Sequence, residues 1–200
     1  MSLPARLDRT FYARHTVDVA RDLLGKVLVR VGPDGPRLSR IVETEAYHGH
    51  EDRASHASRG RTPRTAPMFG PAGLAYVYQI YGMYFCLNAV TGPEGFPSAA
   101  LIRAVEPIEG AFGPKEGAGP GKLCRLLDIK RELNTTDLVE GQALWIGDDG
   151  AVVPPEAVLA GPRIGVDYAG DWVHTPWRFW VAVSHSVSRG RAAAARPAAG

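Results

Sequence analysis

The fold is decided by a run of alternating residues, RIVETEAY at positions 40–47. Successive side chains of a β-strand point to opposite faces, so Glu43, Glu45 and Tyr47 share one face. The alternate residues Val42, Thr44 and Ala46 form a less polar face. We therefore predict a strand whose apolar back packs on a core while two carboxylates and a phenol face outward.

Other stretches of the chain show short patterns of the same kind. Further strands are expected at 26–31, 74–80, 84–90, 99–105, 143–146 and 177–183. Helices are expected from Thr16 to a stop at Gly25, and from Pro120 onward. Many short strands with few helices predict an α+β fold, with a curved, mainly antiparallel sheet and peripheral helices.

One domain of residues 1–188 is expected, with residues 1–9 frayed. The last residues, 189–200, are rich in alanine, arginine and proline and predict a disordered tail. A chain of 200 residues is long enough to bury a core without crosslinks.

Composition points to a soluble cytoplasmic protein. The net charge of +2 gives no extended basic surface, and 45% hydrophobic residues is ordinary for a globular domain. Cys86 and Cys124 lie in apolar patterns, as reduced core thiols do. Since no apolar stretch approaches membrane-spanning length, we expect no membrane partner.

Residues 75–88, AYVYQIYGMYFCLN, predict a β-hairpin with Tyr81 at its tip. Tyrosines are common in strands, so a core hairpin is the simpler interpretation. A tyrosine at the tip, however, exposes apolar area without packing. Aromatic side chains stack on bases and can insert into a duplex step, which makes a nucleic-acid role an alternative.

The two carboxylates, Glu43 and Glu45, are too close in sequence to flank a substrate from opposite sides. We expect one to be catalytic and the other structural, and a solvated strand face remains an alternative. His48, His50, Glu51, Asp52 and His56 lack the stronger metal-binding spacings, so no metal is expected.

Basic residues near these segments are candidate phosphate contacts. A helix beginning at Pro120 offers free backbone amides at Gly121 and the cation of Lys122. Arg61 and Arg64 belong to a short arginine-rich stretch, for which a solvated loop is the simpler interpretation.

The sequence resembles the alkyladenine (3-methyladenine) DNA glycosylase family. RIVETEAY, His56 and the tyrosine-rich hairpin occur in the family's order, followed by LIRAVEP, GPGKLC and RIGVDYAG at 101–107, 119–124 and 163–170. The resemblance extends from Phe11 to Val183, nearly the whole domain.

This resemblance implies a monofunctional DNA glycosylase of base excision repair. Such an enzyme flips alkylated or deaminated purines (3-methyladenine, 7-methylguanine, hypoxanthine, ethenoadenine) out of the duplex and hydrolyses the N-glycosidic bond, leaving an abasic site. Glu45 matches the general base that activates the attacking water. Arg103 and the carbonyl of Ile164 match groups that hold this water. Because no lysine lies among the pocket residues, no lyase activity is expected.

Residues of the base pocket are implied in the same way. Tyr47 and His56 are expected on one face of the flipped base and Tyr78 on the other. Asn88 is expected to exclude the amino group of guanine, and Met83 to contact the base. Tyr81 is expected to fill the gap left by the flipped nucleotide, so that the β-hairpin is inserted into DNA.

The expected partner is double-stranded DNA that contains damaged purines, bound by a monomer without a cofactor. A bacterial, cytoplasmic protein associated with the nucleoid is implied. One segment, 107–119, departs from the family pattern because it is short and glycine-rich, which puts the shape of the DNA-facing rim in doubt.

Three alternatives stay open. The first is a non-catalytic protein that binds damaged bases or single-stranded DNA. The second is a metal-dependent hydrolase built on His48, His50, Asp52 and His56. The third is a carbonyl- or formyl-transfer enzyme, although no GxGxxG cofactor motif occurs.

Overall fold

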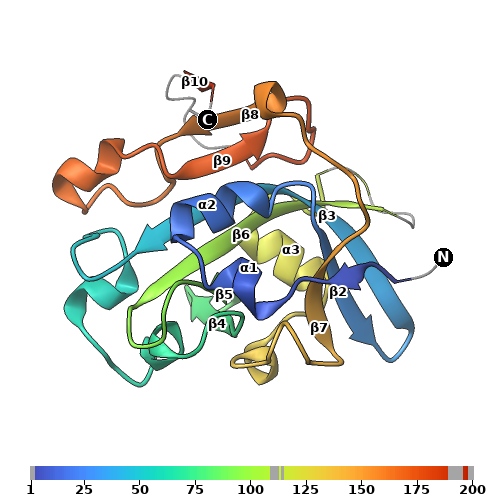
Figure 1. Ribbon diagram of the computed structural model, residues 1–200, viewed down its shortest axis with the longest axis horizontal. Helices are drawn as coiled ribbons and strands as arrows, with labels where there is room; N and C mark the ends of the chain where they lie inside the picture. Colours follow the sequence, from blue (N-terminus) through green and yellow to red (C-terminus); the bar gives the residue numbers. More distant parts are fainter. Residues whose placement is uncertain (1–2, 109–112, 114, 189–195, 198–200) are drawn as a thin grey trace.

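A computed structural model describes residues 3–108, 113, 115–188 and 196–197. Within these residues the chain forms one curled antiparallel sheet with a few short helices (Figure 1). Its main path follows β1 (Ala5–Arg6), β7 (Leu144–Asp148), β2 (Val27–Gly32), β3 (Gly35–His48), β6 (Ser98–Pro107), β5 (Tyr84–Val90) and β4 (Ala75–Ile80). The α+β prediction of a single domain with a curved, mainly antiparallel sheet is confirmed.

Helices lie around the sheet, as expected. The α-helices are α1 (Arg9–Tyr12), α2 (Thr16–Asp22) and α3 (Pro120–Leu126). Short 3-10 helices are η1 (His56–Arg59), η2 (Ala66–Phe69), η3 (Arg131–Leu133), η4 (Pro155–Ala157) and η5 (Gly170–His174). No helix in the described ranges is both long enough and apolar enough to cross a membrane.

The sheet branches at β3, its longest strand. β6 pairs with β3 from Ser39 to His48, whereas β2 pairs only with its first part, up to Arg40. On that same side the span Glu43–Glu45 pairs instead with β9 (Arg178–Val181), which continues to β8 (Val158–Gly161) and β10 (Arg196–Pro197). In Figure 1 these three strands lie along the upper edge of the molecule, beyond α2.

The core lies between the sheet and the helices. Ile102 of β6 and Leu87 of β5 pack in one cluster with Ala20 of α2 and Leu123 of α3. Thr44 Oγ1 donates to the carbonyl of Ala20 at 2.6 Å, which attaches α2 to the back of β3. The prediction that this back is buried is therefore confirmed.

The other face of β3 differs from the prediction. Glu43 and Glu45 were expected to face outward, but both are fully buried. Side chains or backbone N–H groups of Arg103, Ile164, Arg178 and Ser188 reach the two carboxylates on this face. Buried carboxylates persist only where cations and hydrogen-bond donors surround them, and such groups are present here.

The ends of the domain also differ from the prediction in detail. Residues 1–9 were expected to be frayed, but β1 pairs with β7, and the Asp8 side chain caps α1 by accepting from the N–H of Phe11. β8 was not predicted, since its pattern is only four residues long. The predicted tail lies outside the described residues except for Arg196–Pro197, which pair with β8. Most of the unusual 107–119 segment also lies outside them.

Candidate active site

A cavity of about 490 Å³ opens on the face of the sheet that carries Glu45. This volume is within the roughly 300–1,000 Å³ that is typical of small-molecule sites. Its walls come from strands β4, β5 and β6 on one side and from the segments 54–68 and 164–168 on the other. A second cavity, of about 500 Å³, lies between α2 and residues 151–158 and includes none of the predicted site residues.

Strand register brings the polar wall residues together. In the β4–β5 hairpin, Tyr76 is opposite Asn88 and Tyr78 is opposite Cys86, and all four line the cavity. The side-chain amide of Asn88 donates to the carbonyl of Tyr76 at 3.0 Å, so the amide is held across the strand pair. Asn88 therefore lies in the pocket wall, where its predicted role requires it.

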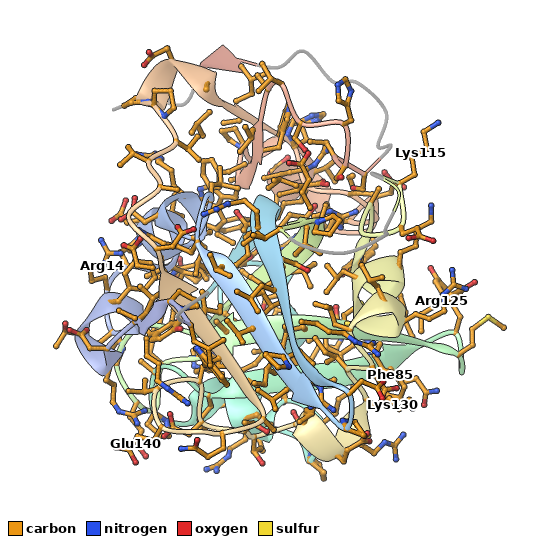
Figure 2. All side chains as sticks on the ribbon, turned by 90° about the vertical axis from the view of Figure 1, so that its right-hand side faces the viewer. Arg14, Phe85, Lys115, Arg125, Lys130 and Glu140 are labelled. Carbon is orange, nitrogen blue, oxygen red and sulfur yellow. The ribbon has the colours of Figure 1, made fainter. Side chains whose placement is uncertain are left out.

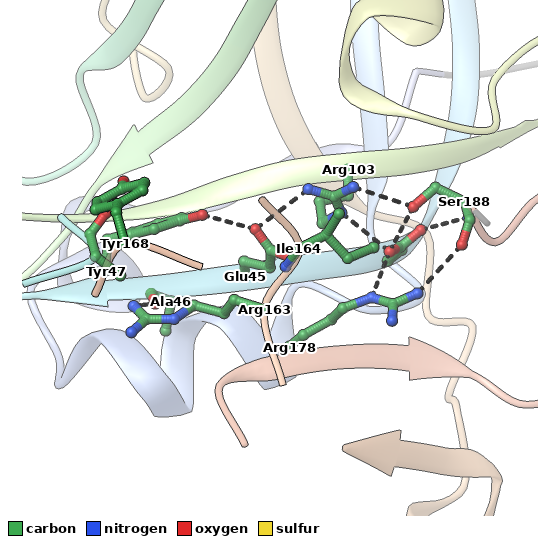
Figure 3. A network of polar contacts seen from close by, with 11 residues as sticks. Glu45, Ala46, Tyr47, Arg103, Arg163, Ile164, Tyr168, Arg178 and Ser188 are labelled. Carbon is green, nitrogen blue, oxygen red and sulfur yellow. Dashed lines mark hydrogen bonds and ion pairs between the residues drawn. The ribbon is translucent and has the colours of Figure 1, made fainter. Parts of the chain in front are cut away.

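Glu45 is fully buried, outside the lining of the cavity, and accepts three hydrogen bonds (Figure 3). Its Oε2 accepts from the hydroxyl of Tyr47 at 2.8 Å and from Nη1 of Arg103 at 3.2 Å. Its Oε1 accepts from the backbone N–H of Ile164 at 2.7 Å. A carboxylate has about four acceptor positions, so Oε1 can accept one further hydrogen bond. The three donor residues themselves line the cavity.

Ile164 reaches the site through a different atom from the one expected. Its N–H contacts Glu45, while the expected role of its carbonyl, to hold a water molecule, stays a prediction.

Glu43 is placed in a different environment from Glu45. Its Oε1 accepts from Nε of Arg103 at 3.0 Å, from Nε of Arg178 at 2.7 Å and from the hydroxyl of Ser188 at 2.8 Å. Its Oε2 accepts from the N–H of Ser188 at 2.6 Å. Neither glutamate lines the cavity itself, but all three donors to Glu45 line it, whereas of the donors to Glu43 only Arg103 does. This arrangement favours Glu45 over Glu43 as the chemically active carboxylate.

Arg103 connects the two carboxylates. Burial alone would lower its pKa, but Glu45 and Glu43 outweigh burial and raise it, so the guanidinium stays charged. Together with Arg178, the cluster contains two buried anions and two buried cations. Because these charges balance, the site can be buried without leaving an unpaired ion.

A second buried ion pair lies behind the site. Arg163 binds Asp52 through two hydrogen bonds of 2.5 and 2.8 Å, and both side chains are fully buried. Arg163 also donates to the carbonyl of Ala46 at 2.8 Å and lies 4.9 Å from the ring centre of Tyr47. The pair thus joins β3 to the segment that leads to His56 and to the backbone that presents Ile164.

The aromatic residues of the cavity are arranged differently from a simple sandwich. The rings of His56 and Tyr78 have centroids 4.6 Å apart and meet edge to face at 78°. A base that stacks between two parallel rings needs one stacking distance to each ring. His56 and Tyr78 touch each other directly, so no base fits between these two rings. A flat base between Tyr47 and Tyr78 remains compatible with the cavity, because both of these residues line it.

Protonation states follow from burial. Burial, followed by the charges of Arg64 and Arg59, lowers the pKa of His56 to about 4, so the imidazole is neutral near pH 7. Burial and then the neighbouring Glu45 raise the pKa of Tyr47 well above its usual range. Tyr47 is therefore a phenol that donates to Glu45, not a phenolate.

The histidines and acids proposed for a metal site do not gather. His48 Nδ1 contacts Thr16 Oγ1 at 3.0 Å, while Asp52 is bound to Arg163. The ring of His50 lies 5.7 Å from that of Phe69. Over the described ranges, no three side chains of His, Cys, Asp or Glu come together as metal ligands would. This geometry does not support the metal-hydrolase alternative.

The hairpin tip is the most exposed aromatic feature of the described chain. Tyr81 is 86% exposed and borders the cavity. Met83 is 66% exposed and does not line the cavity, so the structure does not bring it to the base pocket.

Basic residues lie around the cavity and hairpin. Arg64 borders the cavity, with its guanidinium 5.1 Å from the ring centre of Tyr78, whereas Arg61 lies further out against Phe69. Gly121 packs so closely on the ring of Tyr84 that a Cβ atom would lie 2.9 Å from it. The next residue, Lys122, is exposed. Figure 2 shows three more cations, Lys115, Arg125 and Lys130, along one edge of the molecule.

Several site residues were missed from the sequence. They are Arg178 and Ser188, which bind Glu43, and Arg163, which binds Asp52, together with the exposed Tyr168, which borders the cavity. Asp52 was considered only as a metal ligand. Tyr168 donates to the carbonyl of Ala54 at 3.1 Å. Two of these residues, Arg163 and Tyr168, lie in the RIGVDYAG motif, which was the available signal.

Comparisons with known proteins give one family over most of this chain. A family model described as "Methylpurine-DNA glycosylase (MPG)" matches residues 10–185. The chain is 58% identical over 184 residues to a protein of Anaeromyxobacter dehalogenans (strain 2CP-C), covering 92% of this chain and 87% of the relative. It is 52% identical over 194 residues to a protein of Methanocella arvoryzae, covering 92% and 96%. It is 49% identical over 199 residues to a protein of Streptomyces avermitilis, covering 93% and 92%. Each relative carries the name "Putative 3-methyladenine DNA glycosylase".

Proposed function

The chain belongs to the methylpurine-DNA glycosylase family, and from this membership we propose that it excises 3-methyladenine and related damaged purines from double-stranded DNA. The resemblance noted in the sequence is thereby confirmed. The protein is a DNA repair enzyme that hydrolyses an N-glycosyl bond. The proposal includes the range of lesions, the flipping of the base and the insertion of the hairpin into DNA. It also includes action as a monomer, in the cytoplasm at the bacterial nucleoid.

The observation that carries the proposal is the environment of Glu45. Three donors that line the cavity fix its carboxylate, and Oε1 keeps one acceptor position for a water molecule. We assign Glu45 as the general base that takes a proton from this water as the oxygen attacks C1′ of the sugar. The purine departs with the electron pair of the glycosidic bond. A methylated purine is an electron-poor leaving group, so one carboxylate suffices.

The flipped base is assigned to the cavity between Tyr47 and Tyr78. His56, which is neutral and meets Tyr78 edge-on, is placed at the base edge. Its Nδ1 contacts the hydroxyl of Tyr76 at 3.3 Å, so Nε2 is the ring nitrogen assigned to the base. Asn88 is assigned to exclude the amino group of undamaged guanine by a clash. Met83 would reach the base only if the hairpin moved on binding.

Tyr81 is assigned to the gap that the flipped nucleotide leaves in the duplex. A ring that is 86% exposed at a hairpin tip contributes little to the core, and insertion between base pairs would bury it. Arg61, Arg64, Gly121 and Lys122 are assigned to backbone phosphates on the surrounding surface.

A non-catalytic binding protein explains the site less well. A protein that only binds a polyanion gains nothing from a carboxylate beside its pocket, because even a paired buried carboxylate does little more than offset the cost of its desolvation. A catalytic base, by contrast, requires such a group.

Duplexes that each contain one hypoxanthine, ethenoadenine or 7-methylguanine test the proposal. We expect free base and an alkali-labile site while the strand stays intact. Glu45→Gln keeps the size of the side chain but removes the proton acceptor, so release should fall by about two to four orders of magnitude. Lesion binding should stay within a few-fold.

Each contrary result has a distinct meaning. Lesion binding without any base release would support the non-catalytic alternative. Strand cleavage without alkali would indicate a lyase. Full activity of Glu45→Gln, with loss in Glu43→Gln, would make Glu43 the base.

A further inference from the structure

The hairpin tip contains a strained turn. The N–H of Met83 donates to the carbonyl of Ile80 at 3.2 Å, and the two residues between them both have positive φ, +49° at Tyr81 and +69° at Gly82. Positive φ at both central residues defines a type I′ turn. Gly82 adopts this conformation freely, but a bulky tyrosine rarely does. The turn therefore needs support from its surroundings.

Gln79 supplies this support through hydrogen bonds of its side-chain amide. Its Nε2 donates to the carbonyl of Gly82 at 2.7 Å, and its Oε1 accepts from Nη2 of Arg131 at 3.3 Å. A carbonyl only accepts and a guanidinium only donates, so these two partners fix the orientation of the amide. Arg64 donates to the backbone carbonyl of Gln79 at 3.4 Å, which holds the same residue from another segment.

We propose that Gln79 is a positioning residue that holds the type I′ turn, so that the ring of Tyr81 is presented for insertion into DNA. The inference rests on the proposed function. Without the bond from Gln79 to Gly82, the turn can relax to a conformation with negative φ at Tyr81, which redirects the ring. A side-chain hydrogen bond of this type contributes enough to change a rate by about fivefold.

Gln79→Met tests this role because it keeps the length of the side chain and removes both hydrogen bonds. The chain has one other glutamine, Gln142, whose Nε2 donates to the carbonyl of Glu140 at 3.3 Å in an exposed turn. Gln142→Met is therefore a matched control. Single-turnover base release is measured for hypoxanthine opposite thymine and for hypoxanthine opposite an abasic site, and thermal unfolding records whether each variant is folded.

We expect Gln79→Met to slow release about fivefold when hypoxanthine is opposite thymine and to leave release opposite the abasic site nearly unchanged. A lesion opposite an abasic site has no base pair to break and needs less help from the inserted ring of Tyr81. The difference in release rate between the two duplexes therefore reports on Tyr81. In a Tyr81→Ala background, Gln79→Met should cause no further loss. Gln142→Met should leave both rates unchanged.

Several results would overturn the inference. They are an unchanged rate for Gln79→Met, an equal loss in both contexts, or a full fivefold additional loss in Tyr81→Ala. If Tyr81→Ala alone shows no dependence on context, hairpin insertion fails and the role of Gln79 fails with it. A wild-type enzyme that releases no base would contradict the proposed function itself.

Discussion

His56 is a histidine whose charge state is set by its surroundings. Its pKa of about 4 in the folded protein compares with about 6.5 in an unfolded chain. Between these values the unfolded chain binds more protons, so the stability that His56 contributes above pH 6.5 is lost as the pH falls towards 4. Base release should therefore show no step from this residue between pH 6 and 8.

The C–H signals of the His56 imidazole, followed by NMR across a pH series, measure this directly. We expect a midpoint near 4. His56→Gln, which keeps a donor and an acceptor, should remove the corresponding loss of stability in acid. A midpoint near 6.5 would show that the ring is solvated and charged in weak acid, contrary to the described burial.

At the scale of elements, the hairpin turn predicts a conflict between stability and activity. Positive φ costs a non-glycine residue about 1–2 kcal/mol, and a glycine at the same position avoids this cost. Glycine has greater freedom in the unfolded chain, however, which lowers the stability of the folded state by roughly 0.5–1 kcal/mol. Tyr81→Gly should thus raise the free energy of unfolding by on the order of 0.5–1 kcal/mol. It should also slow base release, because the ring is lost.

Tyr81→Ala is the matched variant, since alanine removes the ring but keeps the conformational penalty. Denaturant unfolding of both variants should show a gain only for Tyr81→Gly. Equal stability of the two would mean that the turn is not strained at this position.

The ion pair that joins segment 48–56 to β3 predicts a large loss of stability. Asp52→Asn leaves the fully buried Arg163 without a counter-charge, which typically costs about 3–5 kcal/mol. The control is Asp149→Asn. Asp149 binds Arg40 with the same two-bond geometry, at 2.7 and 2.8 Å, but both side chains are partly exposed. Losing an exposed pair costs about 1 kcal/mol or less.

Denaturant unfolding of the two variants provides the comparison. We expect Asp52→Asn to unfold at a much lower denaturant concentration, and Asp149→Asn to stay near the wild type. Similar losses in both would mean that Arg163 finds water or another partner when Asp52 is neutral.

The elements that could be predicted from sequence are those whose pattern is local. β3 and the two strands of the β4–β5 hairpin are each at least six residues long, and the turn at Tyr81 is marked by the glycine that follows it. The burial of Glu43 and Glu45 could not be predicted in this way. Their partners Arg103, Ile164 and Ser188 lie 58 to 145 residues further along the chain. Alternation shows that two carboxylates share a face, but not what covers it.

At the scale of the whole molecule, the DNA surface predicts a dependence on salt. Binding to DNA releases counterions, so affinity should fall steeply as salt rises. Lys122→Ala should lower the slope of log affinity against log salt by about one unit, without changing lesion preference. Lys26→Ala is a control of the same residue type, because Lys26 already pairs with Asp148 at 2.5 Å.

Fluorescence anisotropy with a labelled duplex, titrated at several salt concentrations, gives both slopes. An unchanged slope for Lys122→Ala would remove this residue from the DNA surface. Equal changes for the two lysines would indicate a general effect of net charge.

The donors around the two carboxylates have a consequence for protein synthesis. Glu43 and Glu45 leave the ribosome early, but Arg103, Ile164, Arg178 and Ser188 follow in that order, and Ser188 is the last of their donors among the described residues. While Ser188 is still inside the ribosome, Glu43 and Glu45 of the nascent chain lack their complete set of donors. Repair activity therefore arises only after nearly all of the domain has been translated, and incomplete translation products are expected to be inactive on DNA.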